Sequence, residues 1–273
     1  MMHTLENKFA KGGGIDMKIA LVGYGQMGHM LRSVAEKRNH KVVLTVDTFA
    51  EDADFKPSSP AETAEKIAKS GADGIIEFSH PSSVIDNIAA LLPLKLPLVV
   101  GTTGWNDKRE EVKKLAEKNS SYIFHSANYS IGVNLFYKII EQASSLISKY
   151  DEYDCALWEA HHTKKLDSPS GTALELAQIV LNNMKSKKTI VTESFHERPK
   201  KEELHVSSTR LGNVPGTHTV YFDSSADTIE LKHIVRNREG LALGAVRALE
   251  WLRAKIDESS LAPGMFSMEN ILN

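Results

Sequence analysis

The stretch that decides the fold is KIALVGYGQMGHML, residues 18–31. It joins a short apolar run to a segment of helical spacing through Gly23, Gly25 and Gly28. In such a G-x-G-x-x-G turn, the first glycine permits the tight turn and the second lets a pyrophosphate approach the backbone. The third lets the helix pack closely on the strand. Because amides at a helix start favour an anion, the stretch predicts a dinucleotide-binding βαβ unit.

An acidic residue stands where such a unit places its ribose-binding carboxylate. Asp47 ends the next β-branched apolar run, 19 positions after Gly28. Its carboxylate would accept hydrogen bonds from ribose hydroxyls and repel a 2′-phosphate. Residues 48–56, which follow, carry more acid than base. The pattern favours NADH over NADPH, and the alternative is a glycine-rich turn that binds nothing.

The first half of the chain alternates strand and helix patterns. Ser59 and Pro60 are expected to begin one of the helices, as its cap and first residue, and Gly71 to stop it. Strands are expected at residues 18–22, 42–47, 74–78, 98–101 and 122–126, and the other helices at 26–37, 81–92 and 108–119. Strands that alternate with helices predict βαβ units and a parallel sheet.

The pattern changes after residue 126. Helices are expected at 133–149, 169–184 and 241–254, and strands at 153–159, 204–211, 217–223 and 228–235. Ser168 is expected to cap the second of these helices, with Pro169 as its first residue. The result is an α/β chain with two domains. Residues 17–130 with 239–273 form a Rossmann-type parallel-sheet domain, and 131–238 an α+β substrate domain with a mixed sheet of about four strands.

The composition excludes several classes of protein. Lys and Arg number 33 against 35 Asp and Glu, so the chain lacks the basic surplus of a dedicated nucleic-acid binder. No run approaches the roughly 20 apolar residues of a membrane span. The single cysteine, Cys155, lies in an apolar run and predicts a buried thiol in a reducing compartment. We expect a cytoplasmic globular protein with a polar, disordered leader at residues 1–16.

The richest polar stretch is AHHTKKLDSPSGT, residues 160–172. His161, His162 and Lys165 follow a predicted strand, and Gly171 and Thr172 lie in the first turn of the next helix. An anionic group could bind the helix-start amides beside Lys165, and an imidazole could bind it too or deliver a proton. The alternatives are a solvated loop and a zinc site. Adjacent histidines are not a usual ligand pair and acidic partners are sparse, so no metal is predicted.

The segment EAHHTKKLDSPSGTA, residues 159–173, resembles the signature of the 4-hydroxy-tetrahydrodipicolinate reductase family of lysine and diaminopimelate biosynthesis. Four further segments are similar to the family: GTTGW at 101–105, SANYSIGVNLF at 126–136, GTHTVYF at 216–222 and KHIVRNR at 232–238. The similarity runs from Lys18 almost to the C-terminus. The glycine turn is one residue shorter than the family's common form.

The resemblance implies roles for individual residues. His161 and Lys165 correspond to the catalytic proton donors, and His162, Gly171 and Thr172 to substrate contacts. The cofactor contacts correspond to Gly23, Tyr24, Gly25, Gln26, Met27, Gly28, Asp47, Gly101, Thr102, Thr103, Ser126, Ala127, Asn128 and Tyr129. The family further implies a small dicarboxylate substrate, NADH or NADPH as cofactor, and a homotetramer assembled through the substrate-domain sheet.

Two other functions fit parts of the pattern. A different two-domain dehydrogenase, acting on an amino or hydroxy acid, would share the glycine turn and Asp47 but would not need residues 159–173. A non-catalytic nucleotide sensor would bind NAD(H) without turnover, and the intact proton-donor segment argues against it. Oxidation of NADH with freshly made hydroxy-tetrahydrodipicolinate separates these functions.

Overall fold

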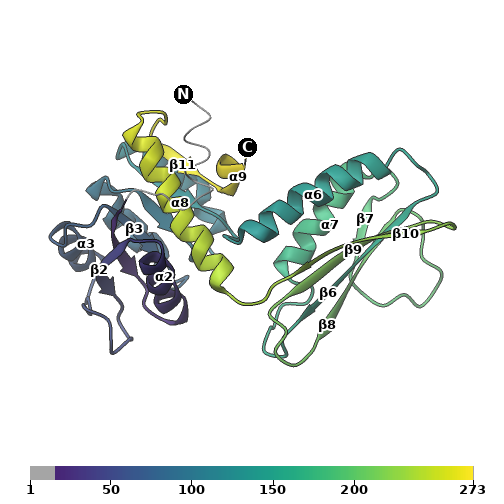
Figure 1. The fold of residues 1–273 in the computed structure, drawn as a ribbon, viewed down its shortest axis with the longest axis horizontal. Coiled ribbons are helices and arrows are strands. Elements are labelled where there is room, and N and C mark those ends of the chain that lie inside the picture. The colour runs from purple at the N-terminus through teal and green to yellow at the C-terminus, as the bar shows by residue number, and fades with distance from the viewer. Residues whose placement is uncertain (1–15, 273) are drawn as a thin grey trace. The chain divides into compact units, whose positions relative to one another are not determined.

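The computed structural model describes residues 16–272, and the chain divides into two compact units (Figure 1). One unit contains the chain up to Ser130 together with the part from Glu239 onward, and the other is Ile131–Arg238. The leader expected to be disordered, residues 1–16, lies outside the described residues except for Asp16. The α/β fold class predicted from the sequence is confirmed, with a parallel sheet in one unit and a mixed sheet in the other.

The first unit is built on a six-stranded parallel sheet. Its order is β11-β5-β4-β3-β1-β2. The strands are β1 (Lys18–Val22), β2 (Lys41–Val46), β3 (Gly74–Glu77), β4 (Leu98–Val100), β5 (Tyr122–His125) and β11 (Gly264–Phe266). The chain passes from β1 to β2 on one side and then crosses to β3 on the other. In open α/β sheets, ligands bind at the carboxyl ends of the strands beside such a reversal.

Helices cover both faces of this sheet, which explains why its strands are continuously apolar. They are α2 (Gln26–Lys37), α3 (Pro60–Ala68), α4 (Val84–Leu91), α5 (Arg109–Lys118), α8 (Glu239–Asp257) and α9 (Met268–Leu272), with short 3₁₀ turns η1 (Leu92–Leu94) and η2 (Asn106–Lys108). The predicted start of α3 is confirmed, because Ser59 accepts a hydrogen bond from the amide of Glu62 and Pro60 is the first helical residue. Strand β11 and helix α9 were not predicted.

Helix α8 returns from the second unit to pack on α2 and β3, as the sequence suggested. A buried ion-pair group fixes it there. Glu250 on α8 receives a forked contact from Arg38, at 2.7 and 2.8 Å, and a contact from Nε2 of His40 at 2.8 Å. Burial alone would raise the pKa of Glu250, but these partners hold it below its usual value. The C-terminal helix is therefore an integral part of the first unit.

The second unit has a five-stranded mixed sheet in the order β10-β9-β6-β8-β7. Its strands are β6 (Asp154–His161), β7 (Thr189–Val191), β8 (Glu203–Arg210), β9 (Thr217–Asp223) and β10 (Thr228–Ile234), and α6 (Ile131–Ile147) and α7 (Gly171–Asn183) cover one face. Inward side chains such as Leu157, Val206 and Val220 pack against Leu176 of α7. The short strand β7 was not predicted. Cys155 is buried in this core as expected, and burial raises its pKa to about 12.

Two predicted boundaries beside residues 160–172 were wrong. Helix α7 begins at Gly171, and its cap is Ser170 rather than Ser168. The sequence offers two serines, and Ser170 is the one whose hydroxyl is buried against His218, where the amide of Ala173 can donate to it. Strand β6 also continues past Glu159 to His161, because it pairs with β8 up to the His161–Arg210 position. His161 therefore belongs to the sheet and not to a loop.

No helix in the described part of the chain is long and apolar enough to cross a membrane.

Candidate active site

The glycine turn has the geometry that a dinucleotide requires. Gly23 has a φ of +92°, and a Cβ there would lie 2.0 Å from the carbonyl oxygen of Phe78. A Cβ on Gly28 would lie 2.5 Å from the carbonyl oxygen of Gly23, so helix α2 packs directly on the turn. Around Gly25, by contrast, nothing lies within 4 Å of a Cβ position. The backbone at Gly25 is open where a pyrophosphate would approach the start of α2.

Asp47 is tied to this turn by backbone amides. Its Oδ2 accepts from the amide of Tyr24 at 2.7 Å, and its Oδ1 accepts from the amides of Phe49 and Ala50 at 2.7 and 2.9 Å. Partial burial raises the pKa of Asp47, but the three amides outweigh that effect and lower it below its usual value. The carboxylate thus joins the end of β2 to the glycine turn and stays ionised.

The predicted segment 101–103 lies at the carboxyl end of β4. Gly101 is needed because the ring of Phe78 occupies the space a Cβ would take, at 1.8 Å. Trp105 turns back to donate from its indole nitrogen to the carbonyl oxygen of Thr102 at 2.7 Å. This closed loop buries Thr102 and leaves Thr103 exposed. Gly101 and Thr103 are therefore the accessible parts of the segment.

The predicted segment 126–129 follows β5 at the same edge of the sheet. The hydroxyl of Ser126 donates to the carbonyl oxygen of Asn128 at 2.9 Å, which makes a tight turn. Tyr129 is buried, and its hydroxyl donates to the carbonyl oxygens of Val100 and Phe124 at 2.7 and 3.1 Å. Its side chain ties β4 to β5, so Tyr129 can face a cofactor only through its backbone.

A buried carboxyl group at this edge was not predicted. Glu77 is the last residue of β3, and its Oε1 accepts from the amide of Ser79 at 3.2 Å and the side-chain amide of Asn87 at 3.4 Å. Burial raises the pKa of Glu77 above its usual value. In the sequence it ends an apolar run that carries no polar motif, so no signal there marks it.

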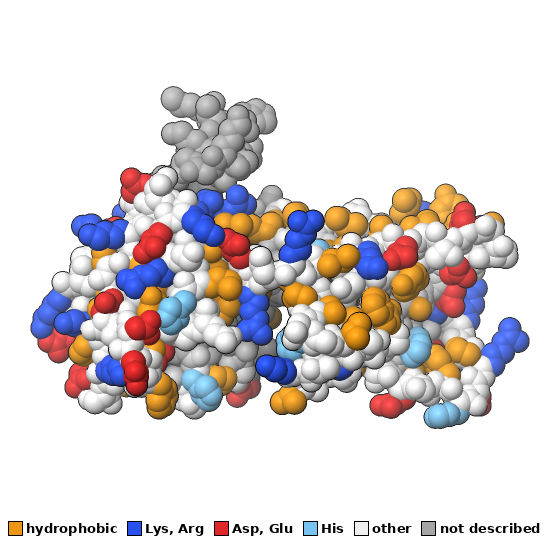
Figure 2. All heavy atoms as spheres, turned by 60° about the horizontal axis from the view of Figure 1, so that its bottom comes forward, with side chains coloured by type: hydrophobic (Ala, Val, Ile, Leu, Met, Phe, Trp, Pro, Cys, Tyr) orange, Lys and Arg blue, Asp and Glu red, His pale blue; other side chains and the backbone are white. Residues whose placement is uncertain are grey.

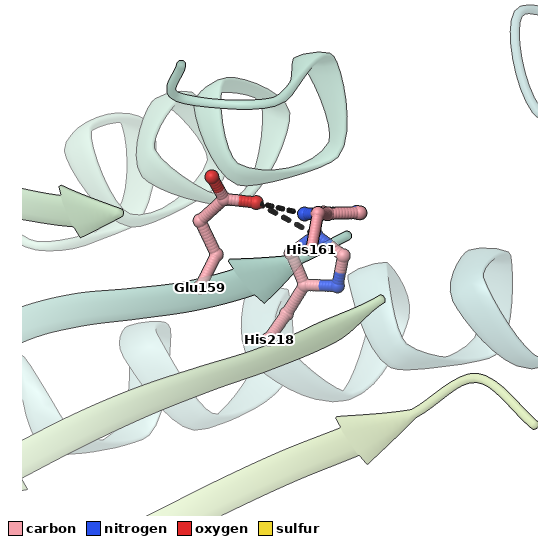
Figure 3. Close-up of side chains that lie close together, drawn as sticks. All are labelled: Glu159, His161 and His218. Carbon is pink, nitrogen blue, oxygen red and sulfur yellow. Dashed lines mark ion pairs between the residues drawn. The ribbon is translucent and has the colours of Figure 1, made fainter. Parts of the chain in front are cut away.

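In the second unit, His161 lies in a buried cluster with Glu159 and His218 (Figure 3). Nδ1 of His161 contacts Oε2 of Glu159 as an ion pair. Nε2 of His218 lies 3.9 Å from the same oxygen, and its ring meets that of His161 edge-on with centroids 5.1 Å apart. Residues two apart in a strand share a face, and β6 and β9 place Glu159 opposite His218. The sheet register therefore builds the cluster.

Arg210 sets the charge of this cluster. Its Nη1 donates to Oε1 of Glu159 at 2.8 Å, and its Nη2 donates to the carbonyl oxygen of Asp167. Burial would raise the pKa of Glu159, but the contacts with His161 and Arg210 hold it well below its usual range. Burial and the neighbouring His161 lower the pKa of His218 to about 4, so this ring is neutral at pH 7.

The other predicted substrate residues lie on the loop after β6 and at the start of α7. Nζ of Lys165 pairs with Oδ1 of Asp167 at 2.7 Å rather than with either histidine. His162 is half-buried, Gly171 is exposed, and Thr172 is half-buried in the first turn of α7. The structure thus brings His161 together with Glu159, Arg210 and His218, and places Lys165 beside Asp167.

Glu159, His161 and His218 also offer a set of metal-ligand atoms within 4.8 Å of one another. His161 and His162 were the pair weighed as zinc ligands from the sequence, and the structure brings together a different set. Arg210 already compensates the one carboxylate at 2.8 Å, and its positive charge opposes a second cation there. The arrangement favours a hydrogen-bonded acid–base group over a metal centre.

The glycine turn lies where the strand order of the parallel sheet reverses, and an ionised carboxylate follows β2. These features define an oxidoreductase of the nicotinamide-dinucleotide class. The chain belongs to the dihydrodipicolinate reductase family. The model of the family's N-terminal part matches residues 17–129, and that of its C-terminal part matches 132–272. The family resemblance inferred from the sequence is confirmed, and so is the enzyme class.

Relatives and a solved structure agree with this assignment. A protein from Christiangramia forsetii named 4-hydroxy-tetrahydrodipicolinate reductase is 35% identical, over 94% of this chain and 98% of its own. One of the same name from Archaeoglobus fulgidus is 36% identical, over 94% of this chain and 100% of its own. The dipicolinate-bound dihydrodipicolinate reductase from Paenisporosarcina sp. TG-14 shares the fold, with a TM-score of 0.71 at 22% identity, covering 94% of this chain and 100% of its own.

Proposed function

We propose that this chain reduces 4-hydroxy-tetrahydrodipicolinate to tetrahydrodipicolinate, with net loss of water, in lysine and diaminopimelate biosynthesis. The family assignment and the names of the relatives support the reaction. The observation that carries it in this chain is the placement of His161. His161 is the last residue of β6, and its imidazole lies in a buried acid–base cluster. The loop that follows carries Lys165 and leads to the first turn of α7.

The substrate is a cyclic dicarboxylate, and unit 2 offers complementary groups. Lys165 and His162 supply cationic or hydrogen-bonding side chains, and the amides of Gly171 and Thr172 lie in the first helical turn, where anions are favoured. These charges are local. Over the face in Figure 2, acidic and basic side chains are interspersed, in keeping with a formal net charge of -2 for the whole chain.

The chemistry divides between cofactor and protein. When bound, the nicotinamide would supply the hydride that reduces C4 of the substrate ring. The protein must then place a proton on C3, and His161 or Lys165 donates it. In this proposal the dinucleotide is held by residues 23–28, Asp47, 101–103 and 126–129. Gly25 fits this role well because its backbone is open to a pyrophosphate, and Asp47 because it is an ionised hydrogen-bond acceptor.

We further propose that NADH is preferred over NADPH. Three backbone amides keep Asp47 ionised and fixed in position beside the glycine turn. A fixed negative charge at the ribose would repel a 2′-phosphate. A larger kcat/KM with NADPH than with NADH would overturn this preference.

The sheet of unit 2 is the proposed surface of a homotetramer. Within residues 16–272, helices α6 and α7 cover one face of the sheet, and β10 forms an edge that pairs with β9. The edge strand exposes the apolar side chains of Ile229 and Ile234. An uncovered sheet edge of this kind is a surface for association. A solution mass of one chain would contradict the proposal. The lone buried thiol of Cys155 supports a cytoplasmic location.

The function is tested by a coupled assay with freshly generated substrate and each cofactor. His161→Ala and Lys165→Ala should each lower kcat about 100-fold or more, while NADH still binds. Lys164→Ala is the matched control, because this neighbouring lysine is exposed and should leave kcat within about twofold of the wild type. Unchanged turnover in both active-site variants would contradict the assignment of the proton donors.

A further inference from the structure

Glu159 is a buried carboxylate with two distinct sets of partners. Its Oε1 accepts from Arg210 at 2.8 Å, and its Oε2 faces Nδ1 of His161. The side chain is fully buried, and so is most of the side chain of Arg210. A buried carboxylate is retained as an anion only where such partners compensate it. Arg210 supplies that compensation, which leaves Oε2 available to hold the imidazole.

The two nitrogens of His161 lie in different surroundings. Nδ1 faces Glu159, whereas Nε2 faces Gly216, the residue before β9. A Cβ on Gly216 would lie 3.0 Å from Nε2 and 3.4 Å from Cδ2 of the His161 ring. A side chain at position 216 would therefore cover the Nε2 edge. The absence of that side chain leaves Nε2 as the nitrogen that another molecule can reach.

His218 limits the movement of the His161 ring. It stands edge-on to that ring with centroids 5.1 Å apart, and its own Nε2 lies 3.2 Å from the hydroxyl of Ser170. Because Ser170 also caps α7, the ring of His218 is held by the helix that begins the proposed anion site. The ring of His161 is thus held by a carboxylate at one nitrogen and by a fixed imidazole at its side.

We propose that Glu159 is a positioning residue that fixes the Nδ1–H tautomer of His161, so that Nε2 is the nitrogen that exchanges the proton with substrate. Its use in catalysis rests on the proposed function. In the forward reaction the donor is the imidazolium form of His161: the N–H bond at Nε2 breaks, its electron pair stays on nitrogen, and a C–H bond forms at C3 of the substrate. The proton on Nδ1 stays on the ring, facing Glu159, so the product is the neutral Nδ1–H tautomer. A proton from solvent later restores the N–H at Nε2.

The decisive variant is Glu159→Gln, studied in the full-length chain. We expect kcat to fall about 10-fold or more, because the imidazole loses the carboxylate that orients it, with KM for NADH within about twofold. The ¹⁵N signals of His161, assigned by comparison with His161→Asn, should show Nδ1–H in the wild type and a mixture of tautomers in the variant. A purely structural role would not change the tautomer.

Glu203→Gln is the matched control, because Glu203 lies on the neighbouring strand β8 and its side chain accepts from the amide of Lys200 at 2.8 Å, away from His161. It should leave both the tautomer and kcat unchanged. Should Glu159→Gln fail to fold, Gly216→Ala provides the second test. It should lower kcat by covering Nε2 while the Nδ1–H signal persists.

Three outcomes would overturn the proposal. One is an unchanged His161 tautomer in Glu159→Gln, and another is full kcat in Gly216→Ala. The third is loss of activity on dialysis against a chelator with recovery in Zn²⁺, which would make Glu159 a metal ligand. Failure of the proposed function has a different signature: a wild-type chain without turnover would still give the Nδ1–H signal.

Discussion

Two carboxylates, Asp47 in the first unit and Glu159 in the second, are each tied to a functional segment by different means. Asp47 is held by three backbone amides, two of them within three residues along the chain. Glu159 is held by side chains of His161 and Arg210 and lies opposite His218 across strand pairings. The first arrangement follows from a local motif and the second from sheet register. We therefore expect the first site to be most sensitive to substitutions that disturb the backbone, and the second to changes in the charge or protonation of its side chains.

The largest effect is expected from Gly23→Ala. The new Cβ would lie 2.0 Å from the carbonyl oxygen of Phe78, at a φ of +92° that side chains rarely adopt. We expect loss of measurable NADH binding and a decrease of about 3 kcal/mol in the free energy of unfolding. Urea unfolding and NADH titration measure the two effects.

Gly25→Ala is the control for this prediction, because nothing lies within 4 Å of its Cβ position. It should leave the free energy of unfolding nearly unchanged and weaken NADH binding alone. Equal destabilisation by the two variants would contradict the difference between a glycine required by the turn and one required by the ligand.

An effect of similar or smaller size is expected from acid at the second site. Burial and the neighbouring His161 lower the pKa of His218 to about 4, against 6.5 for an ordinary histidine. His218 therefore gains its proton near pH 6.5 in the unfolded chain but only near pH 4 in the folded chain. Stability should fall as the pH is lowered through this window, by at most about 3 kcal/mol from this group.

His218→Asn removes the titrating group and keeps a polar side chain. Urea unfolding of both proteins between pH 7 and pH 4 should show a shallower pH dependence in the variant. Carboxylates with lowered pKa, Glu159 among them, lose their contribution only below about pH 4.5, so the upper part of the window reports on histidines. His29, His125 and His233 also have shifted pKa values, and their contribution is common to both proteins, so the difference between the two profiles belongs to His218. Parallel pH profiles would rule out this role for His218.

A repeated dipeptide shows how far the sequence could predict the fold. Ser59–Pro60 and Ser168–Pro169 both matched the pattern of a helix cap followed by proline. The first begins α3 as predicted, but α7 is capped by Ser170. The difference lies in a tertiary contact, because Ser170 is held against His218, which comes from 48 residues further along the chain. Local patterns predict whether a segment is a helix or a strand, and contacts with distant residues decide at which of two similar residues the helix begins.

The same limit applies to the candidate sites. The glycine turn and Asp47 were predicted because their spacing along the chain reflects a local geometry. Glu159 was passed over as a strand end, although its spacing of two from His161 places both on one face once β6 is known to include them. His218 lies in the family-like segment 216–222 but was given no role, and neither it nor Arg210 could be placed beside Glu159, because strand register cannot be inferred from one sequence.

The smallest effect is expected from Asp47→Asn. An amide in place of the carboxylate retains one acceptor for the amides of Tyr24, Phe49 and Ala50 and removes the negative charge beside the ribose. We expect a loss of about 1 kcal/mol in the free energy of unfolding and a rise of about tenfold in the NADPH-to-NADH ratio of kcat/KM.

Asp54→Asn is the matched control, since Asp54 accepts from the amide and hydroxyl of Thr45 on β2 at 2.9 and 2.8 Å. That variant should lose similar stability with an unchanged cofactor ratio. An equal change of the ratio in both variants would mean that loop order, and not the charge of Asp47, discriminates between the cofactors.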